Sequence, residues 1–249
     1  MAGGSGNLRL RVRKGLYPHE GQDATARLAA SPLVLSGWPP MDALTPADPF
    51  AVTTLEQLGA IYDPPRELVL KKVAPKLEPK SKAFIAASPF AILATCGGNG
   101  PHATPRGDAP GFIVPLDDQT LALPDRRGNN RLDGLRDILE NPEVALLFLI
   151  PGVGETLRIN GTARLTADPA LRDRFLAQGK PPATVLLVTV REVYMQCAKA
   201  IMRSKLWGGR ERPAAVPSMG ALLAAHTGGL VEVASYDAEA PQRLLDTMY

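Results

Sequence analysis

The sequence contains few of the residues that build disulfide frameworks and metal sites. Its 249 residues include only two cysteines and three histidines. Cys96 and Cys197 are too few and too far apart for a disulfide framework or a zinc site, and three histidines argue against a histidine-based metal centre. We therefore predict buried, reduced thiols, no bound metal and a cytoplasmic location.

Long apolar runs and a strong charge of one sign are also missing. No stretch approaches the ~20 apolar residues that cross a bilayer. The net charge is only +3, and the basic residues are dispersed along the chain, which argues against nucleic acid as the main ligand. The apolar content of 45% is ordinary for a globular protein. We expect a globular protein with neither a membrane partner nor a nucleic-acid partner.

Residues 1–48 differ in composition from the rest of the chain. They carry Gly, Ser, Pro and Arg without apolar periodicity, and the first acidic residue is Glu20. The basic run Leu8–Lys14 fits the Arg-rich part of a transit peptide, but the Ser-rich part is missing. We predict either a disordered extension or residues upstream of the true start.

The remaining chain alternates between helical and strand patterns. Hairpin turns join strands that are close in sequence, and single helices cross between them, which predicts an antiparallel barrel with attached helices. Gly161 is predicted to form a β-bulge, and Asp168 with Pro169 is predicted to begin a helix that runs to about Gln178. The predicted helices are 55–61, 67–73, 81–87 and 129–140, and the predicted strands are 90–95, 102–106, 111–115, 120–123, 144–150, 155–166 and 184–190.

Two clusters of arginine and small residues follow predicted strands. Arg106 is either an anion clamp or a surface side chain paired with Asp108. The run Pro124–Arg131 holds three arginines and two asparagines before a predicted helix. It forms either a phosphate site at the helix N-terminus or a solvated turn in which Asn129 or Asn130 caps the helix.

A third motif places Lys199, Arg203 and Trp207 at successive spacings of four residues. On a helix they would form one stripe, either on the surface with Arg203 stacked on Trp207 or against a planar ligand ring. The sequence places no histidine to activate either cysteine, and Cys96 is expected in the core. His102 either faces the ligand or is a satisfied structural residue. The catalytic residues remain unknown.

Together these segments resemble the pyridoxamine 5′-phosphate oxidase-like flavoproteins, and most closely a bacterial subgroup of FMN-dependent enzymes without a settled substrate. The resemblance covers about residues 53–249 and is specific for the family. It is carried by Ser88–Thr95, Pro105–Phe112, Leu123–Leu139, Asn141–Ala163 and Cys197–Trp207.

The resemblance implies a six-stranded, Greek-key-like split β-barrel of the α+β class, and a homodimer with FMN at the subunit interface. It implies an FMN-binding domain at 49–215 and a C-terminal helical segment at 216–249 packed on the barrel. Cofactor contacts are implied for three segments of the chain. They are Arg106, Gly107, Asp108, Ala109 and Pro110; Leu123 and Pro124; and Asn130 and Arg131, with Arg126 and Arg127 less directly indicated.

The chain also departs from the vitamin-salvage oxidase. Its phosphate segment reads Asn-Asn-Arg instead of Ser-Arg-Lys, and the C-terminal substrate segment of that oxidase is not recognisable. The subgroup motif at Cys197–Trp207 is present, so Lys199, Arg203, Ser204 and Trp207 are implied contacts to flavin or substrate. We expect an FMN-dependent oxidoreductase with a different small-molecule substrate. The alternative is a non-catalytic sensor or carrier on the same barrel that binds flavin, haem or a deazaflavin.

Overall fold

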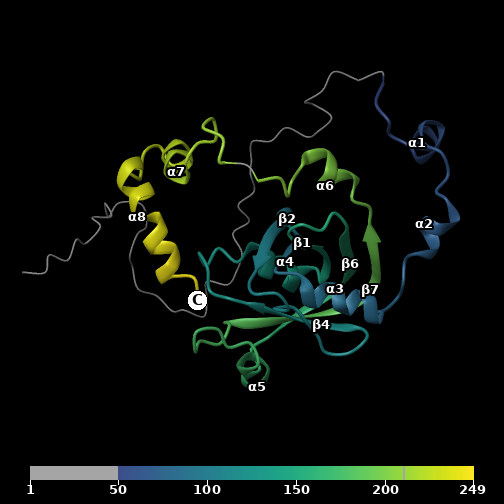
Figure 1. Cartoon of the computed structure of the whole chain (residues 1–249), viewed down its shortest axis with the longest axis horizontal. Coiled ribbons are helices and arrows are strands. Elements are labelled where there is room, and N and C mark those ends of the chain that lie inside the picture. Colours follow the sequence, from purple (N-terminus) through teal and green to yellow (C-terminus); the bar gives the residue numbers. More distant parts are fainter. Residues whose placement is uncertain (1–49, 210) are drawn as a thin grey trace, which may run out of the picture. The chain divides into compact units, whose positions relative to one another are not determined.

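The computed structural model describes residues 50–209 and 211–249 (Figure 1). The predicted N-terminal extension, 1–48, lies outside these residues. The chain divides into two units, Met1–Asp63 and Pro64–Tyr249. In the first unit, helix α1 (Leu55–Ile61) begins with a capping box, because the Thr54 side chain accepts from the backbone of Gln57 and the Gln57 side chain accepts from the backbone of Thr54.

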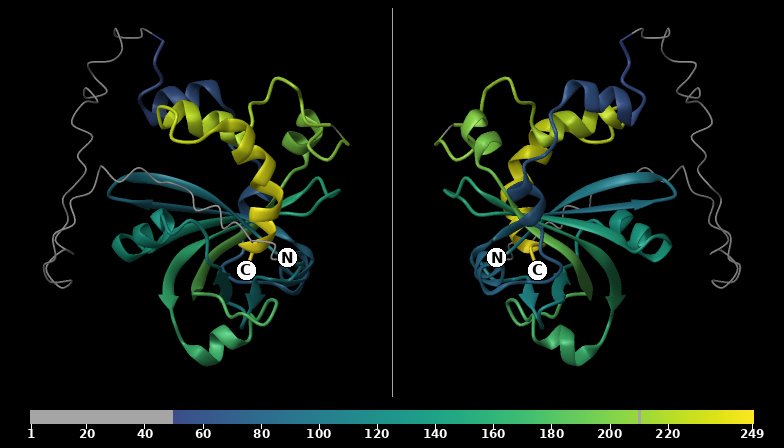
Figure 2. Two further views of the ribbon diagram at one scale, coloured as in Figure 1. Left: turned by 90° about the vertical axis from the view of Figure 1, so that its left-hand side faces the viewer. Right: turned by 90° about the vertical axis from the view of Figure 1, so that its right-hand side faces the viewer.

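The second unit contains one antiparallel sheet and the remaining described helices. No helix in the described ranges is long and apolar enough to cross a membrane. Helix α4 packs against the hairpin of the first two strands, and Figure 2 shows it beside that ribbon. The helices are α2 (Glu67–Lys71), α3 (Pro79–Ala87), α4 (Asp133–Glu140), α5 (Pro169–Asp173), α6 (Lys199–Ser204), α7 (Met219–His226) and α8 (Val233–Asp246).

The sheet has seven strands in the order β2-β1-β5-β6-β7-β4-β3. The α+β class is confirmed. The resemblance implied a six-stranded barrel, whereas the sheet has the seven strands predicted segment by segment, and its backbone ladder does not close. Strand β3 covers only the last two residues of the predicted strand 111–115. It pairs with β4 across a turn that the Asp117 carboxylate stabilises by accepting from the backbone of Gln119 and Thr120. The strands are β1 (Phe90–Gly97), β2 (Gly100–Gly107), β3 (Val114–Pro115), β4 (Thr120–Asp125), β5 (Glu143–Leu149), β6 (Thr156–Thr166) and β7 (Thr184–Gln196).

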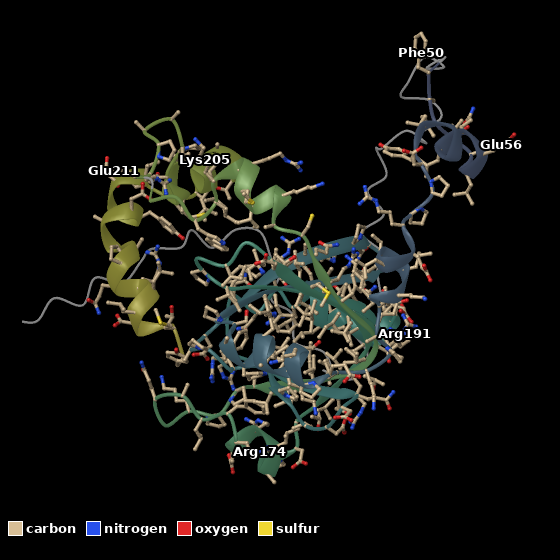
Figure 3. All side chains as sticks on the ribbon, turned by 45° about the vertical axis from the view of Figure 1, so that its right-hand side comes forward. Phe50, Glu56, Arg174, Arg191, Lys205 and Glu211 are labelled. Carbon is tan, nitrogen blue, oxygen red and sulfur yellow. The ribbon has the colours of Figure 1, made fainter. Side chains whose placement is uncertain are left out.

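The core lies on the inner face of this curled sheet. The alternation predicted for β6 is confirmed, since Leu157, Ile159 and Ala163 are buried. Side chains fill the space that the strands enclose (Figure 3). The predicted bulge at Gly161 is also confirmed by a shift in the β6–β7 register. A Cβ on this residue would lie 2.0 Å from the Thr189 carbonyl oxygen, so only glycine fits here.

Some of the local predictions were wrong. Cys96 and Cys197 are both free and exposed instead of buried. In β1 the side chains of Leu93 and Thr95 point inward, so the period of two directs Cys96 outward. The helix predicted at 129–140 begins only at Asp133, and its N-cap residue is Leu132, not an asparagine.

Candidate functional site

The ends of β2 and β4 meet through an ion pair, although the two strands are not neighbours in the sheet. A guanidinium nitrogen of Arg106 on β2 bonds the Asp125 carboxylate on β4. Both side chains are largely buried. The Nε–H of Arg106 is buried as well, and it has no hydrogen-bond partner among the described residues. A buried donor without a partner is costly, so this nitrogen marks a place where an acceptor would be stabilised.

A second ion pair lies beside the first. The Arg126 Nε donates to the Asp108 carboxylate at 2.6 Å, and its Nη1 donates to the Phe175 carbonyl oxygen at 3.1 Å. Burial alone would raise the pKa of Asp108, but hydrogen bonds from the Ala109 backbone and Arg126 outweigh it and lower this pKa. The sequence offered Asp108 as a partner for Arg106, and this pairing was wrong. Arg106 on β2 instead bonds Asp125 on β4, and Arg126, just after β4, bonds Asp108, just after β2.

The loop between β4 and α4 forms a concave backbone surface. Asn130 and Leu132 have φ angles of 57° and 61°, a left-handed conformation that is uncommon for residues other than glycine. The Arg131 backbone donates to the Asn129 side chain at 3.0 Å, and its guanidinium bonds the Asp133 carboxylate. Helix α4 begins immediately afterwards, so its first N–H groups and its positive dipole end face this loop.

These elements enclose a pocket of about 230 Å³. We call it the anion cradle. It brings together four of the residues indicated by the sequence: Arg106, Arg126, Asn130 and Arg131. It also contains Asp125, which sequence reasoning missed because only the fold brings the end of β4 to β2. Arginine forks and free helical N–H groups in one concavity suit a phosphate or another small anion.

An adjacent pocket of about 290 Å³ extends from the cradle along β2. Gly107, Asp108 and Pro124 line it, together with Tyr249, whose hydroxyl donates to the Asp108 carboxylate at 3.1 Å. This hydrogen bond raises the pKa of Tyr249 above its ordinary value. Sequence reasoning missed Tyr249, since no local signal links it to a turn so far away in the chain.

The other residues implied by the resemblance lie apart from these two pockets. Leu123 is fully buried in β4, opposite Leu186 of β7. Ala109 and Pro110 are exposed in the turn after β2. Arg127 lines a different pocket, with Arg172.

The Lys199–Trp207 motif does not form the predicted helical stripe. Helix α6 ends at Ser204, and Lys205 then takes a left-handed conformation. Trp207 therefore leaves the helix, and its indole N–H donates to the Val153 carbonyl oxygen at 2.7 Å. Lys199, Arg203, Ser204 and Trp207 line neither the cradle nor the adjacent pocket.

His102 lies on the same face of β2 as Arg106 but is engaged structurally. Its Nδ1 lies 2.7 Å from an oxygen of the Asp137 carboxylate, and the Thr95 hydroxyl donates to the same oxygen at 2.6 Å. Asp137 is 4% exposed. Burial would raise its pKa, but the bonds to Thr95 and His102 outweigh burial and lower it. This cluster anchors α4, and with it the rim of the cradle, to the β1–β2 hairpin.

Replacing Asp137 by Asn should destabilise the fold by about 1–3 kcal/mol near neutral pH, because two bonds to a buried carboxylate weaken. A carboxyl whose folded pKa is lowered stabilises the protein fully above its unfolded value of about 3.9, and this contribution is lost as pH falls through the folded pKa. Urea unfolding should therefore give a lower free energy of unfolding for Asp137→Asn than for the wild type, and this difference should become smaller below about pH 4. The exposed Asp173, changed to Asn, is the control, and an equal loss there would contradict the account.

Comparison with known proteins finds one family that is similar to part of the chain. The sequence model of the pyridoxamine 5′-phosphate oxidase family matches residues 77–197. This range contains all seven strands of the sheet, the cradle and the adjoining turn. Over these residues, which make up just under half of the chain, the sequence is similar to the pyridoxamine 5′-phosphate oxidase family.

The solved structures that are similar to part of this chain include three bacterial proteins. HupZ of Group A Streptococcus is 22% identical, with 47% of this chain and 91% of that chain covered and a TM-score of 0.39. General stress protein 26 of Bacillus anthracis is 19% identical, with coverages of 45% and 88% and a TM-score of 0.35. An FMN-binding protein of Syntrophomonas wolfei is 12% identical, with coverages of 47% and 83% and a TM-score of 0.38. Similarities this weak carry no functional argument. No curated protein matches the chain.

Proposed function

We propose that this protein binds FMN and acts as an FMN-dependent oxidoreductase on a small-molecule substrate other than pyridoxamine phosphate. The observation that carries the proposal is the buried, unpartnered Nε–H of Arg106 in a pocket that also presents Asn130, Arg131 and the start of α4. A phosphate would accept from this nitrogen and would be favoured by the helix dipole.

In this proposal Arg106, Asn130 and Arg131 hold the cofactor phosphate. The segment Gly107–Pro110 and the strand end Leu123–Pro124 then flank the rest of the cofactor. FMN would supply the redox chemistry by accepting or donating hydride, while the chain binds and orients it. No side chain in the cradle is required as an acid or base.

We also propose that two copies of the chain form a homodimer. The outward face of the sheet carries Ile92, Ala94, Ala145 and Leu147, which are half-buried apolar side chains on the adjacent strands β1 and β5. An apolar sheet face is more stable when it is buried against another apolar surface. In a twofold dimer, the same face of a second copy would pack against it. Lys199, Arg203, Ser204 and Trp207, which lie outside the pockets of their own chain, would then contact the cofactor of the partner.

The cytoplasmic location is part of this proposal. It is supported by the free thiols of Cys96 and Cys197, since an oxidising compartment favours disulfides.

The absorption spectrum of the purified protein tests the proposal. We expect a yellow protein with a flavin spectrum, from which acid releases a compound with the mass of FMN. Oxidation of NADH or NADPH with an added acceptor would then separate an enzyme from a carrier. A haem spectrum or a deazaflavin mass would favour the non-catalytic sensor or carrier, and a colourless protein that takes up no FMN would contradict the proposal.

A further inference from the structure

A second cationic pocket shares Arg126 with the cradle. Its volume is about 330 Å³, within the range of small-molecule sites. The end of β4, helix α5, the turn before β7 and the C-terminal segment supply its walls. It is lined by Arg126, Arg127, Arg172, Lys180, Pro181 and Tyr249.

Three of its four cations are held in place by hydrogen bonds that leave other donors free. The Arg172 Nε donates to the Pro182 carbonyl oxygen at 2.8 Å, which leaves both terminal nitrogens of that guanidinium without a partner among the described residues. Lys180 donates to a main-chain carboxyl oxygen of Tyr249, the last residue of the sequence, at 2.8 Å. Arg126 is fixed by Asp108 and Phe175. Cations that are already oriented lose little freedom when they bind a ligand.

The pocket has an excess of positive charge. None of its lining side chains is acidic. Two carboxyl groups bond its cations. Asp108 already accepts from Arg126, Tyr249 and the Ala109 backbone, and the main-chain carboxyl group of Tyr249, the last residue of the sequence, accepts from Lys180. Four cations therefore face two carboxylates. Arg127 forms no hydrogen bond or ion pair with any described residue. Like charges gathered in one cavity repel each other, and a bound anion relieves that repulsion.

The remaining walls are apolar and planar. The Tyr249 ring lies over Arg126, with 5.1 Å between the guanidinium carbon and the ring centroid, and Pro181 completes the lining. A ligand that fits this pocket therefore joins an anionic group to a small organic body. Inorganic ions would leave the apolar walls without contact.

We propose that this pocket is a binding site for a small organic anion, with Arg127, Arg172 and Lys180 bonding a phosphate or carboxylate group. It is separate from the cradle, and the proposal does not depend on the protein binding FMN. Its place beside the cradle makes it a natural position for the anionic group of a substrate.

Calorimetric titration of the full-length protein with phenyl phosphate and with benzoate tests the site. We expect at least one of them to bind, and Arg127→Gln and Arg172→Gln each to weaken that binding about tenfold, since a charge-assisted bond contributes ~1.5–3 kcal/mol and ~1.4 kcal/mol is tenfold. Binding of both probes would define a general anion site, and binding of phenyl phosphate alone would define a phosphate site. Lys180→Gln provides a third variant if Arg172→Gln does not fold.

Arg174→Gln is the matched control. Arg174 is exposed at the end of α5, outside the pocket, and it is labelled in Figure 3. Arg174→Gln removes the same charge as the two pocket variants, but it should change the affinity for the probes less than twofold. Failure of both probes to bind, or an equal loss in Arg174→Gln, would overturn the proposal. FMN affinity should be unchanged in Arg172→Gln and phenyl phosphate affinity unchanged in Arg131→Ala, so failure of this site and failure of the FMN proposal are distinguishable.

Discussion

Replacing Arg106 or Arg131 by Ala is expected to weaken FMN binding about ten- to a hundredfold. Each arginine would make charge-assisted bonds to the phosphate worth about 1.5–3 kcal/mol, and ~1.4 kcal/mol corresponds to tenfold. The Arg106 variant should show the larger loss, because its guanidinium is largely buried whereas that of Arg131 is exposed. Fluorescence titration of the flavin-free protein measures the effect.

Riboflavin serves as the control ligand and Arg136 as the control residue. Riboflavin has no phosphate, so both variants should bind it about as well as the wild type. Arg136 is exposed on α4 outside the cradle, and Arg136→Ala removes the same charge close to the site. Unchanged FMN affinity in both Arg106→Ala and Arg131→Ala would remove the cradle as the phosphate site.

If the chain forms the proposed dimer, replacing Leu147 by Glu should convert that dimer into a monomer and release its FMN. Leu147 lies opposite Ile92 on the outward face of β5, where a charge would be desolvated inside the proposed interface. An obligate twofold interface buries about 2,000 Å² or more, so a central charge should disrupt it. Light scattering with absorption detection reports mass and bound flavin together.

Leu176→Glu is the matched control for assembly. Leu176 is 55% exposed and lies after α5, away from the outward face of β1 and β5. It should leave both mass and flavin content unchanged. A wild-type protein that is monomeric and loaded with flavin at micromolar concentration would contradict the dimer and would remove the proposed contacts of Arg203 and Trp207.

Patterns with a short-range cause could be predicted from the sequence. The inward set of Leu157, Ile159 and Ala163 follows from the two-residue period of a strand, and the start of α5 follows from Asp168 as N-cap with Pro169 after it. The Asp168 side chain does accept from the Ala170 backbone, at 2.9 Å. That helix nevertheless ends at Asp173, well before the predicted end at Gln178. The sequence therefore predicted the start of the helix more accurately than its end.

Partners that lie far apart in the chain could not be predicted. Arg106 was singled out by the glycine and proline residues around it, but its carboxylate partner, Asp125, depends on how the sheet curls. Tyr249 reaches Asp108 across most of the chain and carries no local motif. The cation cluster of Arg127, Arg172 and Lys180 likewise comes from three segments that only the fold brings together. Local sequence patterns could therefore single out individual residues, but the contacts between distant segments could be found only from the fold.

The central claim is that the cradle recognises a phosphate on the cofactor. Parallel titrations of the flavin-free wild type with FMN and with riboflavin test it most directly. If Arg106 and Arg131 each make a charge-assisted bond to the phosphate, FMN should bind at least about a hundredfold more tightly than riboflavin. Equal affinities for FMN and riboflavin would contradict the account.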